Sequence, residues 1–334
     1  MLKDILKNKI YIYIKNKNLN QMLSLGENYS ISFLAQGEYN INYILKGNNR
    51  KYVFRVNTGS QLVLENQIRY EYEALKRLEK SGVTPEVYYL DDDKVELNYG
   101  ILIMQYLEGR PLLYNKDLTR AAGIFSKIHS IDVSGNNFKN FIVEYNIFTE
   151  RIKESQRLLV NFFSSDLVDS EQKQFFYKFL NWAEKNKNNE KYYIEHKWHV
   201  INNTEVNSSN FIIGDEQSYL IDWEKPVISD PCQDLTQFLS PTTTLWKTDY
   251  VLSNEEIEGF FSLYVNGLGY DNNIRERVEF YKPYLYLRAL SWCAYAYLEY
   301  QRAGKEIRNM DTFSKIKQYL EPSFTRELLK DYFS

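Results

Sequence analysis

"NTEVNSSNFIIGDEQSYLIDWEKPVISDPCQDL", residues 203–235, is the stretch of the chain that decides the fold. Two short apolar runs in it, "NFII" and "YLID", are joined by the turn-rich "GDEQS", so we expect them to pair as a hairpin. Asn210 and Asp222 then lie near its open end, where cross-strand neighbours are about 5 Å apart. An amide oxygen and a carboxylate oxygen so placed can hold Mg²⁺, which typically takes few protein oxygens. Asn210 and Asp222 are therefore predicted metal ligands; the alternative is that one caps a turn and the other ends a strand.

Glu205 precedes Asn210 by five residues and lies in the loop that leads into the hairpin. It is the only carboxylate between Glu195 and Asp215. A carboxylate at this place can orient or deprotonate a substrate hydroxyl beside a phosphate, as in kinase-type phosphoryl transfer. We therefore predict that Glu205 is catalytic; the alternative is a solvated loop residue.

The chain has 334 residues, enough for two lobes with separate cores. Residues 30–57 favour three strands, 62–80 a helix, and "EVYYLD" and "ILIMQYL" two more strands. The later part of the chain has longer helical patterns, at 115–131, 168–186, 253–268 and 275–304. This order predicts an α+β protein with a nucleotide-binding N-terminal lobe over 1–107, built from a five-stranded sheet and one helix, and a mostly helical C-terminal lobe over 108–334.

Three features of the first lobe could bind a nucleotide. "AQGEYN" connects two strands and could cover phosphates with backbone N–H groups, which makes Gln36, Gly37, Glu38 and Tyr39 candidates. Arg55 on the third strand offers a guanidinium to phosphate, with Glu71 or Glu73 on the next helix as its partner. Gln105 and Leu107, at the end of the fifth strand, could present backbone groups to an adenine edge. Each feature also has an ordinary structural explanation: a hairpin turn, a surface ion pair and a strand end.

Composition excludes several classes of protein. The net charge of −3 lacks the basic footprint of a nucleic-acid binder. The two cysteines, Cys232 and Cys293, cannot form a disulfide framework. The beginning of the sequence lacks signal-peptide features, and no apolar run is long enough for a membrane span, so we expect a cytoplasmic protein without a membrane partner. His129, His196 and His199 do not have the spacing of a zinc site.

The residues from 203 to 235, with Arg55 before them, resemble the aminoglycoside phosphotransferase and choline kinase superfamily, over roughly residues 28 to 300. The family pattern is H-x-D-x-x-x-x-N, a hairpin, an Asp with an aromatic residue after it, and D-P-x-x-D-L. The resemblance implies a two-lobed protein-kinase-like fold, ATP (or GTP) and Mg²⁺ as cofactors, and Asn210 and Asp222 as the metal ligands. It also implies that Asp230 and Asp234 anchor the segment that follows. Arg55 corresponds to the arginine that choline kinases carry on the third strand.

Two positions depart from the family pattern. Asn203 replaces the family histidine, and Glu205 replaces the catalytic aspartate. One added methylene moves the carboxylate by about 1 Å, and a misplacement of that size can cost about 100-fold in rate. The metal pair and Arg55 are nevertheless retained together, which favours a working enzyme with Glu205 and Asn203 at its catalytic loop. The alternative is a nucleotide-binding pseudokinase with a regulatory or scaffold role.

In this superfamily the helices of the second lobe form the acceptor pocket. Residues 281–300 place Tyr284, Arg288, Trp292, Tyr295 and Glu299 on one helical face. Aromatic rings with a carboxylate suit an amine or quaternary ammonium group, although core packing explains the same stripe. The resulting prediction is an ATP- and Mg²⁺-dependent kinase that acts on a hydroxyl of an amino alcohol, an aminoglycoside or a sugar-like acceptor. The candidate acceptor residues are Trp223, Glu224, Tyr284, Arg288 and Trp292; the acceptor itself and the oligomeric state stay open.

Overall fold

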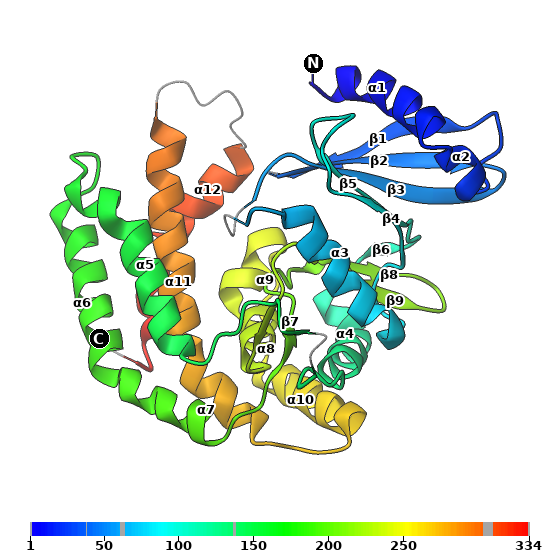
Figure 1. Cartoon of the computed structure of the whole chain (residues 1–334). Coiled ribbons are helices and arrows are strands. Elements are labelled where there is room, and N and C mark those ends of the chain that lie inside the picture. Colours follow the sequence, from blue (N-terminus) through cyan, green and yellow to red (C-terminus); the bar gives the residue numbers. More distant parts are fainter. Residues whose placement is uncertain (1, 38, 61–63, 136–137, 303–309, 333–334) are drawn as a thin grey trace. The chain divides into compact units, whose positions relative to one another are not determined.

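The computed structural model describes residues 2–37, 39–60, 64–135, 138–302 and 310–332. They form two compact units (Figure 1). Unit 1 comprises Met1–Leu112, Ser134–Phe141 and Ser209–Pro226; unit 2 comprises Leu113–Val133, Ile142–Ser208 and Val227–Ser334. The sequence-based boundary at residue 107 had placed 209–226 in the second lobe. These residues pack with unit 1 because β8 (Phe211–Ile213) pairs with β6 (Arg110–Pro111).

Unit 1 contains the predicted five-stranded sheet. Its strand order is β1-β2-β3-β5-β4, and all neighbouring strands are antiparallel. The turn between β2 and β3 is tight because Asn48 and Asn49 both adopt positive φ, at 46° and 59°, the conformation that a two-residue hairpin loop requires. The strand bounds are Ser30–Gln36 for β1, Asn40–Gly47 for β2, Arg50–Asn57 for β3, Val87–Asp91 for β4 and Gly100–Gln105 for β5.

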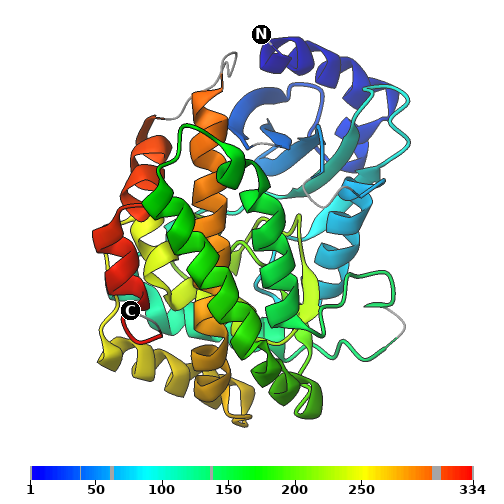
Figure 2. The same cartoon turned by 90° about the vertical axis from the view of Figure 1, so that its left-hand side faces the viewer.

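Two helices precede this sheet that the sequence analysis did not predict: α1 (Leu2–Asn16) and α2 (Leu19–Met22). The apolar residues Leu6, Ile10, Tyr13 and Ile14 recur at helical spacing on α1 and join the core of the sheet. Figures 1 and 2 show α1 lying along the sheet. The Tyr13 hydroxyl also donates to Asp91 Oδ2 at 2.5 Å, which ties this helix to β4.

The helix α3 (Gln67–Leu78) follows β3 and continues as a short 3-10 turn, Glu79–Ser81, that stops at Gly82. It begins later than the predicted residue 62 because Asn66 caps it, its side chain accepting the N–H of Arg69 at 3.2 Å. Residues 62 and 63 lie outside the described part of the chain.

The predicted hairpin of the deciding stretch is present. A 3-10 turn, Ser208–Asn210, leads into β8, which pairs antiparallel with β9 (Ser218–Leu220) in the register Phe211–Leu220 and Ile213–Ser218. The N–H of Gly214 donates to Gln217 O at 3.0 Å and closes the turn.

Unit 2 is mostly helical, with a two-stranded antiparallel sheet of β7 (Val200–Asn202) and β10 (Val227–Ser229). The long helices α5 and α11 run side by side (Figures 1 and 2). The sequence analysis predicted α4, α6, α10 and α11 but missed α5 and the shorter helices. The helices are α4 (Tyr114–His129), α5 (Ile147–Ser164), α6 (Ser170–Asn186), a 3-10 turn (Lys187–Glu190), α7 (Lys191–Glu195), α8 (Cys232–Leu239), α9 (Pro241–Lys247), α10 (Asn254–Leu268), α11 (Ile274–Gln301), α12 (Met310–Tyr319) and α13 (Pro322–Leu329).

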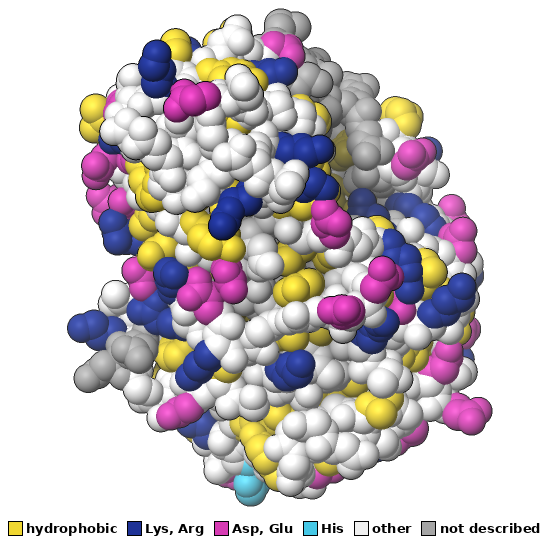
Figure 3. Space-filling view, turned by 90° about the vertical axis from the view of Figure 1, so that its right-hand side faces the viewer, with side chains coloured by type: hydrophobic (Ala, Val, Ile, Leu, Met, Phe, Trp, Pro, Cys, Tyr) yellow, Lys and Arg dark blue, Asp and Glu magenta, His cyan; other side chains and the backbone are white. Residues whose placement is uncertain are grey.

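The small antiparallel sheet unit followed by a helical unit confirms the α+β, two-lobed class that the sequence predicts. None of the described helices combines the length and the apolar composition that a membrane crossing requires. On the face drawn in Figure 3, acidic and basic side chains are interspersed, in keeping with the small net charge of −3.

Candidate active site

The centre of unit 1 holds a buried cation between two carboxylates. Arg55 lies in the middle of β3 and is only 7% exposed. Its guanidinium forms an ion pair with Glu71 on α3 and lies 3.4 Å from Asp222 Oδ1, while its Nε donates to Asn42 Oδ1 at 3.0 Å. Of the two partners that the sequence left open, the structure selects Glu71, because Glu73 pairs instead with Arg77 one helical turn away.

The two charged groups of this pair influence each other. Burial opposes the charge on Arg55, but the carboxylates of Glu71 and Asp222 outweigh it and hold the pKa of the guanidinium above its ordinary value. Burial raises the pKa of Glu71 from 4.5 to about 7, and the charge of Arg55 opposes this shift. Arg55 therefore stays charged, and its partner titrates near neutral pH.

The open end of the hairpin carries the two predicted metal ligands. The N–H of Ile221 donates to Asn210 O at 2.8 Å, which places Asn210 beside the end of β9 as the sequence predicts. Asp222 follows in a left-handed conformation with φ of 64°, a region in which Asp and Asn are enriched. Its side chain is 33% exposed, whereas the next residue, Trp223, is fully buried and donates its indole N–H to Leu220 O at 3.0 Å.

These residues fit a magnesium ion by their chemistry. An amide oxygen and a carboxylate oxygen at one end of a hairpin match the hard donors that Mg²⁺ takes beside waters and substrate phosphates. Among the described residues no group of three or more His, Cys, Asp or Glu side chains is arranged to hold a metal. A site completed by nucleotide phosphates does not need one.

The residues that follow the hairpin are hydrogen-bonded to β2 and α3 of unit 1. Asn40 donates its side-chain N–H to Glu224 Oε2 at 2.5 Å, and Gln67 donates to the backbone carbonyl of Glu224 at 2.5 Å. Trp223 has no exposed surface and packs in the interior, and its place in an acceptor pocket stays a prediction. Glu224 instead acts as a hydrogen-bond partner of β2.

In the strand connection "AQGEYN", the N–H of Gly37 donates to Asn40 O at 2.9 Å. Gln36 and Gly37 are exposed, and a side chain added at Gly37 would meet no atom within 4 Å. The N–H of Thr58 donates to Tyr39 O at 2.7 Å and fixes the end of the turn to β3. Glu38 lies outside the described residues, so the role of the turn in covering phosphates stays a prediction.

The hydrogen bonds at the end of β5 show which backbone groups of Gln105 are already in use. The backbone N–H of Gln105 already donates to Glu86 O at 2.8 Å, and its side chain accepts the N–H of Glu86 at 3.3 Å. That N–H is therefore occupied. Leu107 lies two residues beyond the end of β5, and the carbonyl of Gln105 together with the backbone of Leu107 stays the predicted contact to an adenine edge.

The loop that carries Glu205, the predicted base, belongs to unit 2, and the side chain of Asp234 binds its backbone. The backbone N–H groups of Asn203 and Thr204 donate to the carboxylate of Asp234 at 2.6 Å and 2.8 Å. The side-chain oxygen of Asn203 accepts the N–H of Glu205 at 3.0 Å. Asn203 thus stabilises the loop through its side-chain amide, and Glu205 is partly exposed.

Two further buried residues complete this anchor. His129 Nε2 lies 3.8 Å from Asp234 Oδ2, and its Nδ1 is 2.9 Å from the hydroxyl of Tyr264. Asp230 forms a fully buried ion pair with Arg277 and accepts the N–H of Cys232 at 3.0 Å. Burial raises the pKa of Asp230, and Arg277 opposes that shift. The sequence pointed to both aspartates but to neither of these partners.

The residues of the predicted acceptor stripe on α11 lie in different surroundings. Tyr284 is buried and stacks on Phe148 with ring centroids 3.8 Å apart, so it packs the interior, and its place in an acceptor pocket stays a prediction. Trp292 contacts Trp246 edge-on at 5.5 Å. Arg288 lines a small hollow together with Thr204 of the catalytic loop.

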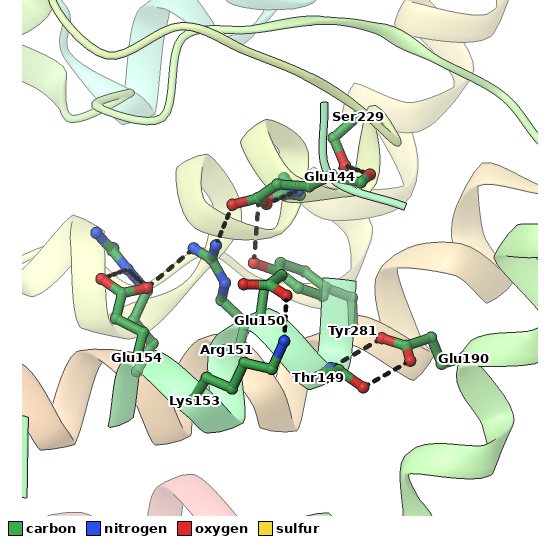
Figure 4. Close-up of polar contacts among 11 residues, drawn as sticks. Glu144, Thr149, Glu150, Arg151, Lys153, Glu154, Glu190, Ser229 and Tyr281 are labelled. Carbon is green, nitrogen blue, oxygen red and sulfur yellow. Dashed lines mark hydrogen bonds and ion pairs between the residues drawn. The ribbon is translucent and has the colours of Figure 1, made fainter. Parts of the chain in front are cut away.

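Arg288 belongs to a polar network that the sequence analysis missed. Its Nε donates to both carboxylate oxygens of Glu154 at 3.1 Å and 3.2 Å. Glu154 also pairs with Arg151, which in turn pairs with Glu144 at 2.6 Å (Figure 4). The Arg151–Glu154 spacing of three residues was the only signal in the sequence, and it carried no weight because α5 was not predicted.

A family model described as the phosphotransferase enzyme family matches residues 30–269. The chain belongs to this family. The match confirms the resemblance to aminoglycoside phosphotransferases and choline kinases that the motif predicts.

Solved structures of the same family share the fold of this phosphotransferase. The choline kinase LicA from Streptococcus pneumoniae aligns with a TM-score of 0.61 at 20% identity, over 95% of this chain and 99% of that chain. A putative aminoglycoside phosphotransferase from Ralstonia eutropha JMP134 aligns with a TM-score of 0.66 at 12% identity, over 98% and 99%. The spectinomycin phosphotransferase APH(9)-Ia, crystallised with ADP and spectinomycin, aligns with a TM-score of 0.60 at 14% identity, over 94% and 98%. A search of curated proteins finds no match.

Proposed function

We propose that this phosphotransferase moves the γ-phosphoryl group of ATP, with Mg²⁺, to a hydroxyl of a small molecule. The observation that carries the proposal is the buried Arg55 between Glu71 and the partly exposed Asp222, with Asn210 at the same end of the hairpin as Asp222. This arrangement fixes the guanidinium of Arg55 and the carboxylate of Asp222 within unit 1. GTP is the alternative donor, and a cytoplasmic location, where both nucleotides and Mg²⁺ are present, is part of the proposal.

Arg55 is the proposed phosphate contact of the first unit. A guanidinium is planar and always charged, and it matches phosphate oxygens in a bidentate manner. Glu71 and Asn42 fix its orientation through the guanidinium and Nε, so little conformational freedom is lost when phosphate binds. Asn210 and Asp222 would hold the metal, which supplies neutralisation of phosphate charge during transfer.

Glu205 is the proposed group that orients the acceptor hydroxyl and takes its proton. The hydrogen bonds of Asn203 and Asp234 to the loop backbone hold Glu205 in one place. These contacts fix the backbone of the loop, from which the Glu205 side chain extends its carboxylate. General-base groups contribute about 10²–10⁴-fold to rate.

The acceptor is proposed to be an amino alcohol, an aminoglycoside or a sugar-like compound. Support comes from relatives of the same fold: two are described as choline kinases and one was crystallised with spectinomycin. These acceptors share a free hydroxyl as the nucleophile.

The test measures nucleoside diphosphate release with Mg²⁺-ATP against a panel of such acceptors. Glu205→Gln and Asp222→Ala are compared with wild type, and Glu216→Gln, in the exposed hairpin turn, is the matched control. We expect acceptor-dependent release that falls in both site variants and is unchanged in the control. Activity lost only in Asp222→Ala would keep the kinase and remove Glu205 from its role.

A pseudokinase is the second candidate, because Glu205 stands where the family carries its catalytic aspartate. A pseudokinase would bind Mg²⁺-ATP and release no diphosphate with any acceptor. Equilibrium binding of the nucleotide, measured beside the release assay, separates the two functions.

A further inference from the structure

The catalytic loop borders a small hollow within unit 2. Its volume is about 10 Å³, room for about one water molecule. Among the described residues that line it there are two arginines and no carboxylate. Apart from one leucine, the lining consists of Arg151, Thr204, Gln233, Gln237, Tyr281 and Arg288.

The two arginines are fixed by carboxylates that do not line the hollow. Arg151 is held between Glu144 at 2.6 Å and Glu154 at 3.2 Å, as Figure 4 shows. Glu154 also receives Nε of Arg288. The charges of these four groups balance, so the hollow is distinguished by hydrogen-bond donors in a fixed arrangement and not by an excess of positive charge.

Several of these donors are unused within the described part of the chain. Arg151 Nε is buried and has no hydrogen-bond partner there. Arg288 is bound to Glu154 through Nε, and its two terminal NH₂ groups make no hydrogen bond to a described residue. A buried donor without a partner is costly, and an anionic oxygen is the acceptor that guanidinium groups bind most strongly.

The hollow lies beside the loop that carries Glu205, the residue proposed to orient the acceptor hydroxyl. Thr204, which lines it, directly precedes Glu205. The negative charge of Glu154 raises the pKa of Arg288, and that of Glu205 acts in the same direction. One molecule can therefore place a hydroxyl at Glu205 and another polar group at Arg288.

We propose that this hollow binds an anionic oxygen of the acceptor, so that the substrate is a hydroxylated carboxylate or phosphate ester and not a simple amine. The inference rests on the proposed function and specifies its substrate class. A cationic acceptor would find two guanidinium groups and no carboxylate among the described lining residues. An anionic oxygen in the hollow would accept the hydrogen-bond donors that Arg288 leaves unused, beside the positive charge of Arg151.

The experiment compares acceptors in matched pairs that differ by one anionic group. The pairs are glycerate with glycerol, serine with ethanolamine, and glucose 6-phosphate with glucose. They separate a carboxylate from a phosphate as the recognised group.

Phosphoryl transfer is measured as kcat and KM for wild type, Arg288→Gln and Arg288→Lys. Arg275→Gln, an exposed arginine on the same helix, is the control. The thermal midpoint of each variant shows whether it is folded.

We expect the anionic member of at least one pair to be preferred, and Arg288→Gln to raise its KM by about 10- to 100-fold, the value of a charge-assisted hydrogen bond. Arg288→Lys should restore part of the affinity, because it keeps the charge but loses the planar fork. Transfer that favours the neutral or cationic members, or that is insensitive to Arg288→Gln in a folded variant, overturns the inference and leaves the proposed function intact. Mg²⁺-ATP binding without transfer to any compound overturns both.

Discussion

Glu205 differs by one methylene from the aspartate that the family pattern has at this position. Asn203 and Asp234 fix the backbone of the loop, so the side chain at residue 205 determines where the carboxylate lies. We predict that Glu205→Gln lowers kcat by about 10²–10⁴-fold. Glu205→Asp should lower it by about 100-fold, because the loop is built for the longer acid. Steady-state kcat for the best acceptor checks both, and an aspartate variant as active as wild type would contradict the account of the loop.

A second prediction at the scale of single residues concerns Glu71 and the pH dependence of the free energy of unfolding. Burial raises its pKa from 4.5 to about 7 in the folded chain. The folded state therefore binds the proton more tightly than the unfolded state, so this group stabilises the fold most below pH 4.5, and the contribution is lost as the pH rises to 7.

Urea unfolding of wild type and Glu71→Gln between pH 4.5 and 8 tests this prediction. The advantage of wild type over the variant should shrink as the pH rises. Glu73→Gln, which alters a surface pair with Arg77, should show a pH profile parallel to that of wild type. Parallel profiles for Glu71→Gln as well would show that Glu71 does not titrate in this range.

At the scale of elements, the start of α8 supports the loop after β7. Asp234 is fully buried and accepts the N–H groups of Asn203 and Thr204. Asp234→Asn leaves one of these donors without a carboxylate oxygen, which should cost about 1–3 kcal/mol of stability. Because the loop then loosens, kcat should also fall while the KM for ATP changes little. Asp271→Asn, at an exposed turn, is the control for urea unfolding and kinetics; equal effects of the two substitutions would contradict this role.

The sequence predicted most elements that carry a strong period or a turn signal. The hairpin of β8 and β9 was predicted because "GDEQS" separates two apolar runs, and the five strands of unit 1 were predicted for similar reasons. Helix α1 was missed because "IYIYI" within it alternates like a strand, although Ile10 and Ile14 pack at helical spacing. Tyr284 was assigned to a pocket because a stripe of aromatic residues does not reveal which rings face the core.

The sequence predicted mainly those residues of the candidate site that lie close together along the chain. Asn210, Asp222 and Glu205 follow from spacing along one stretch of chain. The contacts of Asp234 and the network around Arg151 join residues far apart in sequence, and Arg151 and Asp234 themselves lie on α5 and α8, two helices that had not been predicted. Contacts of that kind arise from packing and leave no periodic signal.

At the scale of the whole molecule, nucleotide binding should stabilise the folded chain. A ligand that binds only the folded state adds about 2.7 kcal/mol at 100 times its Kd. We predict that Mg²⁺-ATP raises the thermal midpoint of wild type and of Glu205→Gln equally, since Glu205 is proposed to act on the acceptor. Asp222→Ala should lose most of this shift. A shift that is equal in all three proteins would contradict Asp222 as a metal ligand.

The most direct test of the account is detection of the transferred phosphoryl group. Mass spectrometry of the acceptor after incubation with Mg²⁺-ATP should show a phosphomonoester with wild type. The product should be greatly reduced with Glu205→Gln and with Asp222→Ala, and unchanged with Glu216→Gln. A wild-type protein that binds Mg²⁺-ATP but forms no phosphorylated acceptor from a broad panel would contradict the account and identify the chain as a nucleotide-binding pseudokinase.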